Sequence, residues 1–339
     1  MQIFDKKYNS IPKIELHCHL EGSIRTQTIL EIARQNNLIL PSYILAELNR
    51  HVKVRKQMKD LRTVLNAFAI FQNSFVSTEI VERITYELCE DANRQNIRLL
   101  EIRFSPDWAF SGHHLDWDLA LQAIQRAQLR ARMDFGLLTV LIAITSRSLG
   151  VASCHKTVEW AIHHRDSILG IDLADNERDH PIHEFIQPVL QARKSGLKVT
   201  IHSGEDTPAS AVVETVEAVH PDRIGHGIHI IEDMNAVEFV KQHEVTLEVN
   251  PWSNYLTNSV SRIEQHPLKQ LYDLGVRVTI NSDDPEVLDT NLNNEYRIAK
   301  EILGMSLADL TNCNRYALNA CFLPEDQKAQ LRQAVPQWN

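Results

Sequence analysis

Short apolar runs rich in Val, Ile and Leu recur along the chain, and longer stretches with helical periodicity separate them. Continuous apolar runs of this kind are typical of parallel strands that are buried on both faces. Eight of them occur, which is the number of strands in a (β/α)8 barrel, so we predict an α/β fold of the TIM-barrel type. The predicted strands are residues 11–16, 97–104, 137–144, 168–173, 197–201, 223–224, 245–249 and 276–280.

Helical periodicity fills the gaps between these runs. Leu119, Ala123 and Ala127 recur at four-residue spacing, and a similar pattern runs from Leu61 to Phe71. The stretch between Glu21 and Ile97 is much longer than one helix requires, so we expect extra helices over the barrel mouth. Helices after Pro285 should complete the outer ring. No Pro/Gly/Ser-rich linker or repeat divides the chain, which predicts a single domain over residues 1–339.

Composition and charge narrow the class of protein. The chain has 339 residues, 43% of them hydrophobic, and a formal net charge of −9, which disfavours binding to nucleic acid or to an anionic membrane. The amino terminus lacks the apolar core of a signal peptide, and the longest apolar stretch is far shorter than the roughly 20 residues of a membrane helix. The five cysteines are scattered and contain no Cys-x-x-Cys. These features predict a soluble, cytoplasmic protein.

Metal-binding residue types follow several predicted strands. His17 and His19 lie two positions apart, so their side chains point to the same face of a strand. His202 ends the fifth run and Asp283 follows the eighth. The carboxyl ends of barrel strands meet at one rim, and imidazole and carboxylate ligands suit zinc or a similar divalent ion. We therefore predict that His17, His19, His202 and Asp283 are metal ligands.

Three further residues near these strand ends are candidates for chemistry. Glu205 could donate and accept protons beside the metal if burial raises its pKa above about 4.3; otherwise it is a solvated loop carboxylate. His226, between two glycines, could orient or deprotonate a metal-bound water; the alternative is a buried structural histidine. Asp284 should face away from Asp283 and reach substrate, unless it only forms the turn before Pro285.

Six segments, in order along nearly the whole chain, resemble the adenosine/adenine deaminase family of metal-dependent barrel hydrolases, and their loop motifs are closest to adenosine deaminase. The segments are residues 12–22, 101–106, 170–174, 202–205, 224–227 and 281–285. The resemblance implies hydrolytic removal of the amino group at C6 of a purine. It also implies one zinc ion per subunit, bound by His17, His19, His202 and Asp283.

The resemblance further implies a role for each remaining residue. The zinc ion would lower the pKa of bound water from 15.7 toward about 7. Glu205 would protonate ring N1, while His226 would assist the water and stabilise the developing charge. Asp284 would contact N7, and the loop of residues 170–177 would contact the other edge of the purine, before ammonia leaves.

Three departures from the family pattern concern the substrate. Glu21 replaces an Asp that usually contacts ribose, and the resulting His-Leu-Glu-Gly resembles adenine deaminases. Asp175 stands where adenosine deaminases usually have Gly, although its backbone N–H could still bind the purine; a positive φ there would be costly, and the carboxylate adds charge. Trp252 follows the seventh run and could either line the pocket or pack in the core.

We expect the substrate to be adenosine or a close adenine nucleoside, converted to the inosine-type product and ammonia. The segment 172–174 favours a nucleoside, whereas Glu21 favours free adenine. Aminodeoxyfutalosine and an alkylated adenosine monophosphate are alternatives with the same chemistry; Lys53, Arg55 and Lys56 could contact a phosphate. A catalytically silent purine-binding scaffold is the alternative of a different class.

Overall fold

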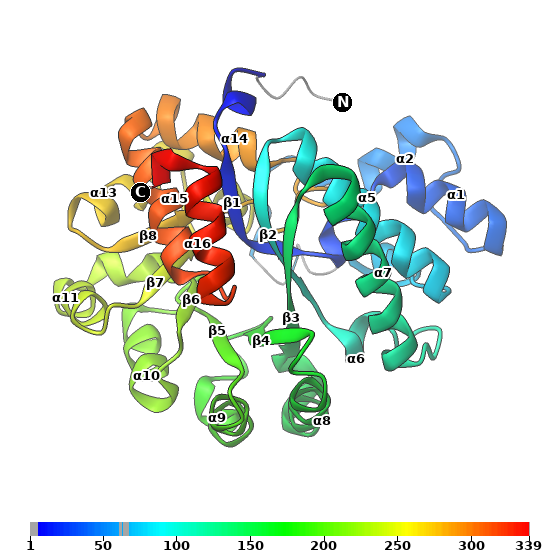
Figure 1. Ribbon diagram of the computed structural model, residues 1–339, viewed down its shortest axis with the longest axis horizontal. Coiled ribbons are helices and arrows are strands. Elements are labelled where there is room, and N and C mark those ends of the chain that lie inside the picture. The colour runs from blue at the N-terminus through cyan, green and yellow to red at the C-terminus, as the bar shows by residue number, and fades with distance from the viewer. Residues whose placement is uncertain (1–5, 61–62, 64–67, 339) are drawn as a thin grey trace.

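Eight parallel strands form one sheet, and neighbours in the sheet follow chain order (Figure 1). The structure is a computed structural model that describes residues 6–60, 63 and 68–338. This architecture confirms the predicted (β/α)8 barrel. The strands are β1 (Lys13–His19), β2 (Ile97–Phe104), β3 (Leu138–Ser146), β4 (Ile168–Ala174), β5 (Lys198–Ser203), β6 (Arg223–His226), β7 (Thr246–Val249) and β8 (Arg277–Ile280).

The barrel closes where the chain beyond β8 meets β1. The backbone N–H of Asp283 donates to the carbonyl oxygen of His17 at 2.9 Å, and the N–H of His19 donates to the carbonyl oxygen of Asp283 at 2.9 Å. The side-chain oxygen of Asn281 also accepts a hydrogen bond from the N–H of Leu16 at 3.1 Å. Strand pairing therefore runs around the barrel, with residues past the end of β8 making the last contacts.

Helices surround the strands and alternate with them along the chain (Figure 1). The α-helices are α1 (Thr26–Asn36), α2 (Leu45–Val52), α4 (Ala69–Gln72), α5 (Thr78–Arg94), α6 (Pro106–Ala109), α7 (Trp117–Phe135), α8 (Gly150–His163), α9 (Ile186–Lys194), α10 (Ala209–Val219), α11 (Met234–Gln242), α12 (Pro251–Leu256), α13 (Leu268–Asp273), α14 (Leu292–Arg297), α15 (Leu307–Ala320) and α16 (Glu325–Ala334). In the described part of the chain, none of the helices is both long and apolar enough to cross a membrane.

The long segment between β1 and β2 contains extra helices, as predicted. Helix α1 lies against α5, where Glu31 pairs with Arg83 at 2.6 Å. The extended residues 53–58 lie beside the loop that follows β8, where the N–H of Val54 donates to the carbonyl oxygen of Val287 at 2.7 Å. Part of the periodic stretch predicted from Leu61 onward lies outside the described residues.

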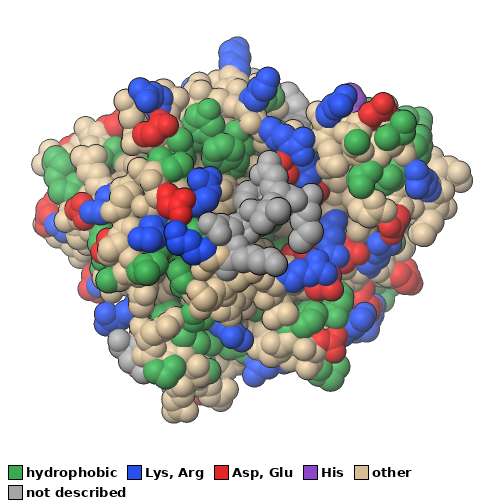
Figure 2. All heavy atoms as spheres, turned by 90° about the horizontal axis from the view of Figure 1, so that it is seen from above, with side chains coloured by type: hydrophobic (Ala, Val, Ile, Leu, Met, Phe, Trp, Pro, Cys, Tyr) green, Lys and Arg blue, Asp and Glu red, His purple; other side chains and the backbone are tan. Residues whose placement is uncertain are grey.

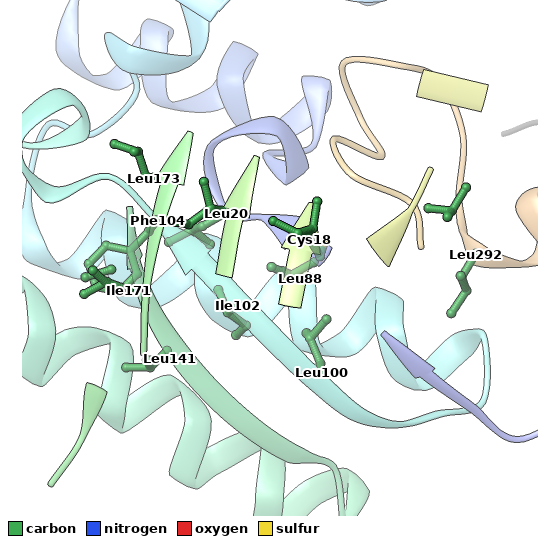
Figure 3. Packing of buried hydrophobic residues seen from close by; sticks show 14 of the residues in the cluster. Cys18, Leu20, Leu88, Leu100, Ile102, Phe104, Leu141, Ile171, Leu173 and Leu292 are labelled. Atoms are coloured by element: carbon green, nitrogen blue, oxygen red, sulfur yellow. The ribbon is translucent and has the colours of Figure 1, made fainter. Parts of the chain in front are cut away.

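Strand β2 shows how the barrel wall differs from a purely apolar one. Leu100, Ile102 and Phe104 are fully buried in the main apolar core between strands and helices (Figure 3). Successive side chains on a strand point to opposite faces, so Glu101 and Arg103 face the barrel interior. Both are completely buried. The interior therefore contains charged groups, which must be paired to be stable there.

The carboxyl-terminal segment packs against the amino ends of the strands. The guanidinium of Arg223, at the start of β6, lies 3.6 Å from the centre of the Phe322 ring. Arg223 donates to the carbonyl oxygen of Ala320 at 2.8 Å, and Glu101 accepts from the N–H of Phe322 at 2.6 Å. The buried charges inside the barrel thus also anchor the chain between α15 and α16.

Candidate active site

Three of the predicted metal ligands bring their donor atoms together at the carboxyl rim. His17 Nε2 lies 3.3 Å from His19 Nε2 and 3.2 Å from Asp283 Oδ1, and His19 Nε2 lies 3.3 Å from the same oxygen. Zinc bonds of about 2.0–2.1 Å in a tetrahedral arrangement would separate donor atoms by roughly 3.3 Å. The donor atoms of His17, His19 and Asp283 therefore have the spacing of zinc ligands.

His202 joins this cluster from β5. Its ring centre lies 4.6 Å from that of His17 and 5.5 Å from that of His19. Its Nδ1 lies 3.0 Å from Asp172 Oδ1, which leaves Nε2 for a metal. Likewise, His17 Nδ1 lies 2.8 Å from Glu248 Oε2. Such carboxylate partners fix the tautomer and orientation of metal-binding histidines.

Arg103 connects these two carboxylates. Its guanidinium donates to Asp172 Oδ2 at 2.6 Å and to Glu248 Oε2 at 2.7 Å, and all three side chains are completely buried. Burial by itself would raise the pKa of Glu248, but Arg103 and Arg223 hold that pKa well below its usual range. Neither Arg103 nor Glu248 was among the candidate residues predicted from the sequence. The feature of the sequence that could have indicated this network is the presence of charged residues inside otherwise apolar strands.

Glu205 is a buried carboxyl beside the donor cluster. Its Oε2 lies 3.6 Å from His226 Nε2, and its Oε1 has no hydrogen-bond partner among the described residues. Burial, followed by the negative charge of Asp283, raises the pKa of Glu205 well above its usual value. Burial thus raises the pKa of Glu205 in the direction that an acid at this position requires, and a protonated Glu205 could donate a proton.

The backbone around Glu205 is held by a second carboxylate, Glu177. Its oxygens accept from the N–H groups of Gly204 at 2.9 Å, Glu205 at 2.9 Å and Asp206 at 2.8 Å. The hydroxyl of Thr207 donates to it at 2.7 Å. The sequence analysis placed this residue in a purine-contacting loop, but its side chain organises the loop that carries Glu205.

His226 ends β6 in a left-handed conformation, with φ of 60°, and Gly227 follows with φ of 68°. This turn directs the imidazole toward the cluster, where its Nε2 lies 3.8 Å from Asp283 Oδ2. Burial lowers the pKa of His226 well below its usual value. A neutral imidazole beside Glu205 and the ligand cluster is consistent with either orienting or deprotonating a water molecule.

Asp284 and Glu21 form another wall of the same pocket. The Asp284 side chain lies directly against the Cα of Gly22, where a Cβ would overlap it. Burial and then Asp283 raise the pKa of Asp284 well above its usual value, and burial raises the pKa of Glu21 to about 7. Glu21 accepts from the N–H of Ser105 at 2.6 Å through one oxygen. Its other oxygen has no partner within the described chain.

Asp175 adopts the positive φ that the sequence analysis considered costly, at 82°. Its carboxylate accepts from the Ser146 hydroxyl at 2.7 Å, from the Ser148 N–H at 3.2 Å and from the Asn176 N–H at 2.7 Å. Short polar side chains tolerate this conformation when they can hydrogen-bond locally. These bonds stabilise the turn and engage the carboxylate with the adjoining loop.

Trp252 packs beside the site and is not one of the residues that line the cavity. Its indole N–H donates to the carbonyl oxygen of Leu288 at 3.0 Å, and its ring lies 5.3 Å from that of Tyr255. Of the two possibilities raised by the sequence, packing is the one observed.

A cavity of about 470 Å³ connects the predicted site residues, a size typical of small-molecule pockets. His17 lies beneath it, completely buried. No Lys or Arg lines its described wall, and Lys53 and Arg55 instead pair with Asp289 at 2.9 and 2.6 Å. The lining includes His19, Glu21, Asp175, His202, Glu205, His226, Asp283 and Asp284.

Acidic and basic side chains lie next to one another on the face of the molecule seen from above (Figure 2). Ion pairs among the described residues include Arg83 with Glu87 at 2.8 Å and Lys156 with Asp107 at 2.8 Å. The surface charge that these residues contribute is therefore largely compensated locally.

Comparison with known proteins identifies the family. The sequence profile of the adenosine deaminase family matches residues 12–338. An adenosine deaminase of Klebsiella pneumoniae is 33% identical over 327 residues, covering 96% of this chain and 98% of that relative. The crystal structure of an adenine deaminase from Arthrobacter aurescens matches with a TM-score of 0.90 at 26% identity, covering 96% of this chain and 98% of that one.

A structure of the N6-methyl-AMP deaminase from Arabidopsis thaliana matches with a TM-score of 0.83 at 29% identity, covering 97% of this chain and 98% of that one. All three relatives are named deaminases, but their names state different substrates. The chain therefore belongs to the adenosine deaminase family of hydrolytic aminohydrolases.

Proposed function

We propose that this chain, working as a single domain, removes the 6-amino group of adenosine or a close neutral adenine nucleoside, giving the inosine-type product and ammonia. One zinc ion per subunit, held by His17, His19, His202 and Asp283, supplies the charge that lowers the pKa of water toward about 7. The donor spacing of 3.2–3.3 Å among His17, His19 and Asp283 supports three members of this set, and the close grouping of His202 with His17 and Asp283 supports the fourth.

Glu205 is the proposed proton donor to ring N1. Its transferred proton makes C6 more electrophilic; the oxygen of water bonds to C6, and the C6–N bond then breaks. Of the two protons of the water, one leaves on the ammonia and the other returns to Glu205. His226 assists the water and stabilises the charge that develops at C6. Asp284 contacts N7, and the turn at Asp175 contacts the opposite edge of the purine.

One observation carries this proposal: a buried carboxyl with a raised pKa, Glu205, opens into the same cavity as the metal-binding cluster. A carboxylate that only served as a ligand would be expected to have a depressed pKa, as Asp283 has beside His17. Two carboxyls in one pocket thus have different proposed roles: Glu205 is the acid and Asp283 is the metal ligand.

The cavity wall favours a neutral substrate over a monophosphate. Its described lining contains no Lys or Arg that could pair with a phosphate, and it includes five acidic residues: Glu21, Asp175, Glu205, Asp283 and Asp284. Lys53, which could contact a phosphate, is engaged with Asp289 and Glu286. Adenosine is preferred to free adenine because relatives at 33% identity carry the adenosine deaminase name. Free adenine is the second candidate, because one oxygen of Glu21 is buried without a partner in the described chain.

The test is ammonia release by the zinc-loaded protein. Adenosine, adenine, aminodeoxyfutalosine, AMP and N6-methyl-AMP should be assayed side by side, with and without a chelator. We expect adenosine to react fastest and the chelator to abolish turnover. Fast turnover of another aminopurine with adenosine intact would keep the chemistry and overturn the substrate. Full zinc occupancy with no turnover of any of these compounds would favour the silent scaffold.

Glu205→Gln tests the assigned acid, because an amide keeps the shape of the side chain but cannot supply the proton. We expect kcat to fall by about 10²–10⁴-fold while zinc content is retained. Glu214→Gln is the matched control, since Glu214 lies exposed on α10. A Glu205→Gln rate close to that of the control would remove Glu205 from its role.

A further inference from the structure

Behind His226, away from the cavity, a chain of hydrogen bonds runs through two buried side chains. The N–H of Leu268 lies 3.1 Å from His266 Nδ1, and His266 Nε2 lies 3.1 Å from Asn254 Oδ1. Asn254 Nδ2 then lies 2.9 Å from His226 Nδ1. The exposed fraction is 0% for Asn254 and 4% for His266, so water does not compete for these bonds.

The direction of every bond in this chain follows from its first member. A backbone N–H can only donate, so His266 Nδ1 must accept from Leu268. Burial lowers the pKa of His266 to about 3, and the neutral ring therefore carries its single proton on Nε2. That proton is donated to Asn254 Oδ1, which orients the amide and turns its N–H toward His226.

A second amide also contacts His226. Asn250 Nδ2 lies 3.2 Å from the carbonyl oxygen of Glu248, which can only accept, so the nitrogen is on this side of the amide. The same nitrogen lies 3.2 Å from His226 Nδ1 and 3.4 Å from Nε2, so it does not distinguish the two ring nitrogens. The assignment therefore rests on Asn254, whose N–H faces Nδ1 of His226, so that Nδ1 accepts this bond and does not hold the proton.

We propose that Asn254 and His266 are positioning residues that keep His226 in the tautomer with its proton on Nε2. His226 then presents a hydrogen-bond donor, not a base, to the side of the ring that faces Glu205 and Asp283. This inference deepens the proposed function: the group that receives the bond is the oxygen that acquires negative charge at C6. With its proton on Nε2, His226 can stabilise the negative charge on that oxygen but cannot deprotonate the water.

The tautomer can be measured without any substrate. Zinc-loaded protein labelled with ¹⁵N in its histidines should be studied by long-range ¹H–¹⁵N correlation, with His226 assigned by comparison with His226→Gln. The expected result is a protonated Nε2 and an unprotonated Nδ1 for both His226 and His266. A proton on Nδ1 of His226 overturns the proposal.

Asn254→Asp reverses the proposed restraint with little change in shape. A carboxylate offers only acceptors, so His226 Nδ1 should become protonated, and its ¹⁵N shift should change accordingly. We expect kcat to fall by about 10²-fold, as when a donor to a developing oxyanion is lost, with KM changed much less. Asn258→Asp, just past the end of α12 and exposed, adds the same charge without contacting His226 and should leave the tautomer and kcat unchanged. If the ¹⁵N chemical shifts of His226 are the same in Asn254→Asp as in the parent protein, the proposed chain of hydrogen bonds from His266 through Asn254 to His226, here called the relay, is wrong.

Two substitutions of His266 separate positioning from packing. In His266→Gln the amide nitrogen takes the place of Nε2 and can still donate to Asn254, whereas the shorter His266→Asn can only replace Nδ1. We expect His266→Gln to preserve the tautomer of His226 and most of kcat, and His266→Asn to lose both. Equal behaviour of the two variants contradicts the relay.

Failure of this inference is distinguishable from failure of the proposed function. If no aminopurine is deaminated but Nε2 of His226 is protonated, the relay stands and the assigned reaction falls. If adenosine is deaminated and Nδ1 is protonated, the reaction stands and the relay falls.

Discussion

The backbone N–H of Asp283 donates a hydrogen bond of 2.9 Å to the carbonyl oxygen of His17, so two predicted metal ligands are joined through the main chain. The N–H of His19 returns a bond to the carbonyl oxygen of Asp283 at 2.9 Å. These bonds close the barrel between its first and last strands. The contacts that close the barrel therefore also bring His17, His19 and Asp283 together.

Removal of a ligand should release the metal. His17→Ala is expected to weaken zinc binding by more than the 10- to 100-fold that outer partners of a ligand typically contribute. Zinc content after dialysis against a chelating buffer measures this directly. His229→Ala is the control, because His229 pairs with Glu232 at 2.9 Å outside the cluster. Parental zinc content in His17→Ala would exclude His17 as a ligand.

The carboxylate behind His17 should tune metal affinity without contacting the metal. In the parent protein one oxygen of Glu248 bonds to His17 and Arg103, and the other accepts from Arg223. Glu248→Gln replaces one of these two acceptor oxygens with an NH2 group. We expect the Kd for zinc to rise about 10- to 100-fold, measured by competition with a chromophoric chelator. Thr200→Val removes only a 2.9 Å bond to the other oxygen of Glu248 and should change the Kd much less. Equal effects of the two substitutions would argue against orientation of His17.

We expect that Gly22 is required because it leaves room for the side chain of Asp284, and not because of its backbone conformation. A Cβ at this position would overlap the Asp284 side chain, so Gly22→Ala must displace Asp284 from the cavity wall. We expect kcat/KM to fall at least about 10²-fold, with folding retained as judged by circular dichroism. Gly112→Ala is the matched control, since a Cβ there meets nothing within 4 Å. An active Gly22→Ala protein would contradict the close contact with Asp284.

Stability should depend on pH through Glu295. Burial raises the pKa of this carboxyl from 4.5 to about 8, although the Thr290 hydroxyl and the Trp252 N–H lower it in part. The folded state then binds the proton more tightly than the unfolded state. The free energy of unfolding should therefore fall as pH rises from about 4.5 to about 8, by up to about 1.4 kcal/mol per pH unit from this group.

Glu295→Gln mimics the protonated carboxyl and should remove this contribution. Urea unfolding at several pH values across the window measures the slope for both proteins, and the difference isolates Glu295 from other groups. Parallel slopes would show that Glu295 does not carry the proton.

Much of the fold could be predicted from the chain because burial on both faces leaves a direct mark on sequence. Strands of the barrel wall appear as continuous apolar runs, and even the four-residue β6, predicted from Arg223 and Ile224 alone, is present. The candidate ligands were proposed by the same logic: His19 ends β1, His202 lies one residue before the end of β5, and Asp283 follows β8. The positive φ of Asp175 was considered costly because local hydrogen bonds to Ser146 and Ser148 are not visible in a linear pattern.

Sequence alone determined which residue types reach the rim, because strand periodicity and strand ends are local properties of the chain. Only the tertiary structure decided how these groups are paired and protonated. Arg103 joins Asp172 to Glu248, and His266 orients Asn254, across separations of 12 to 145 residues. Such contacts depend on closure of the barrel, and the pKa of each buried group depends on the charges that closure brings beside it.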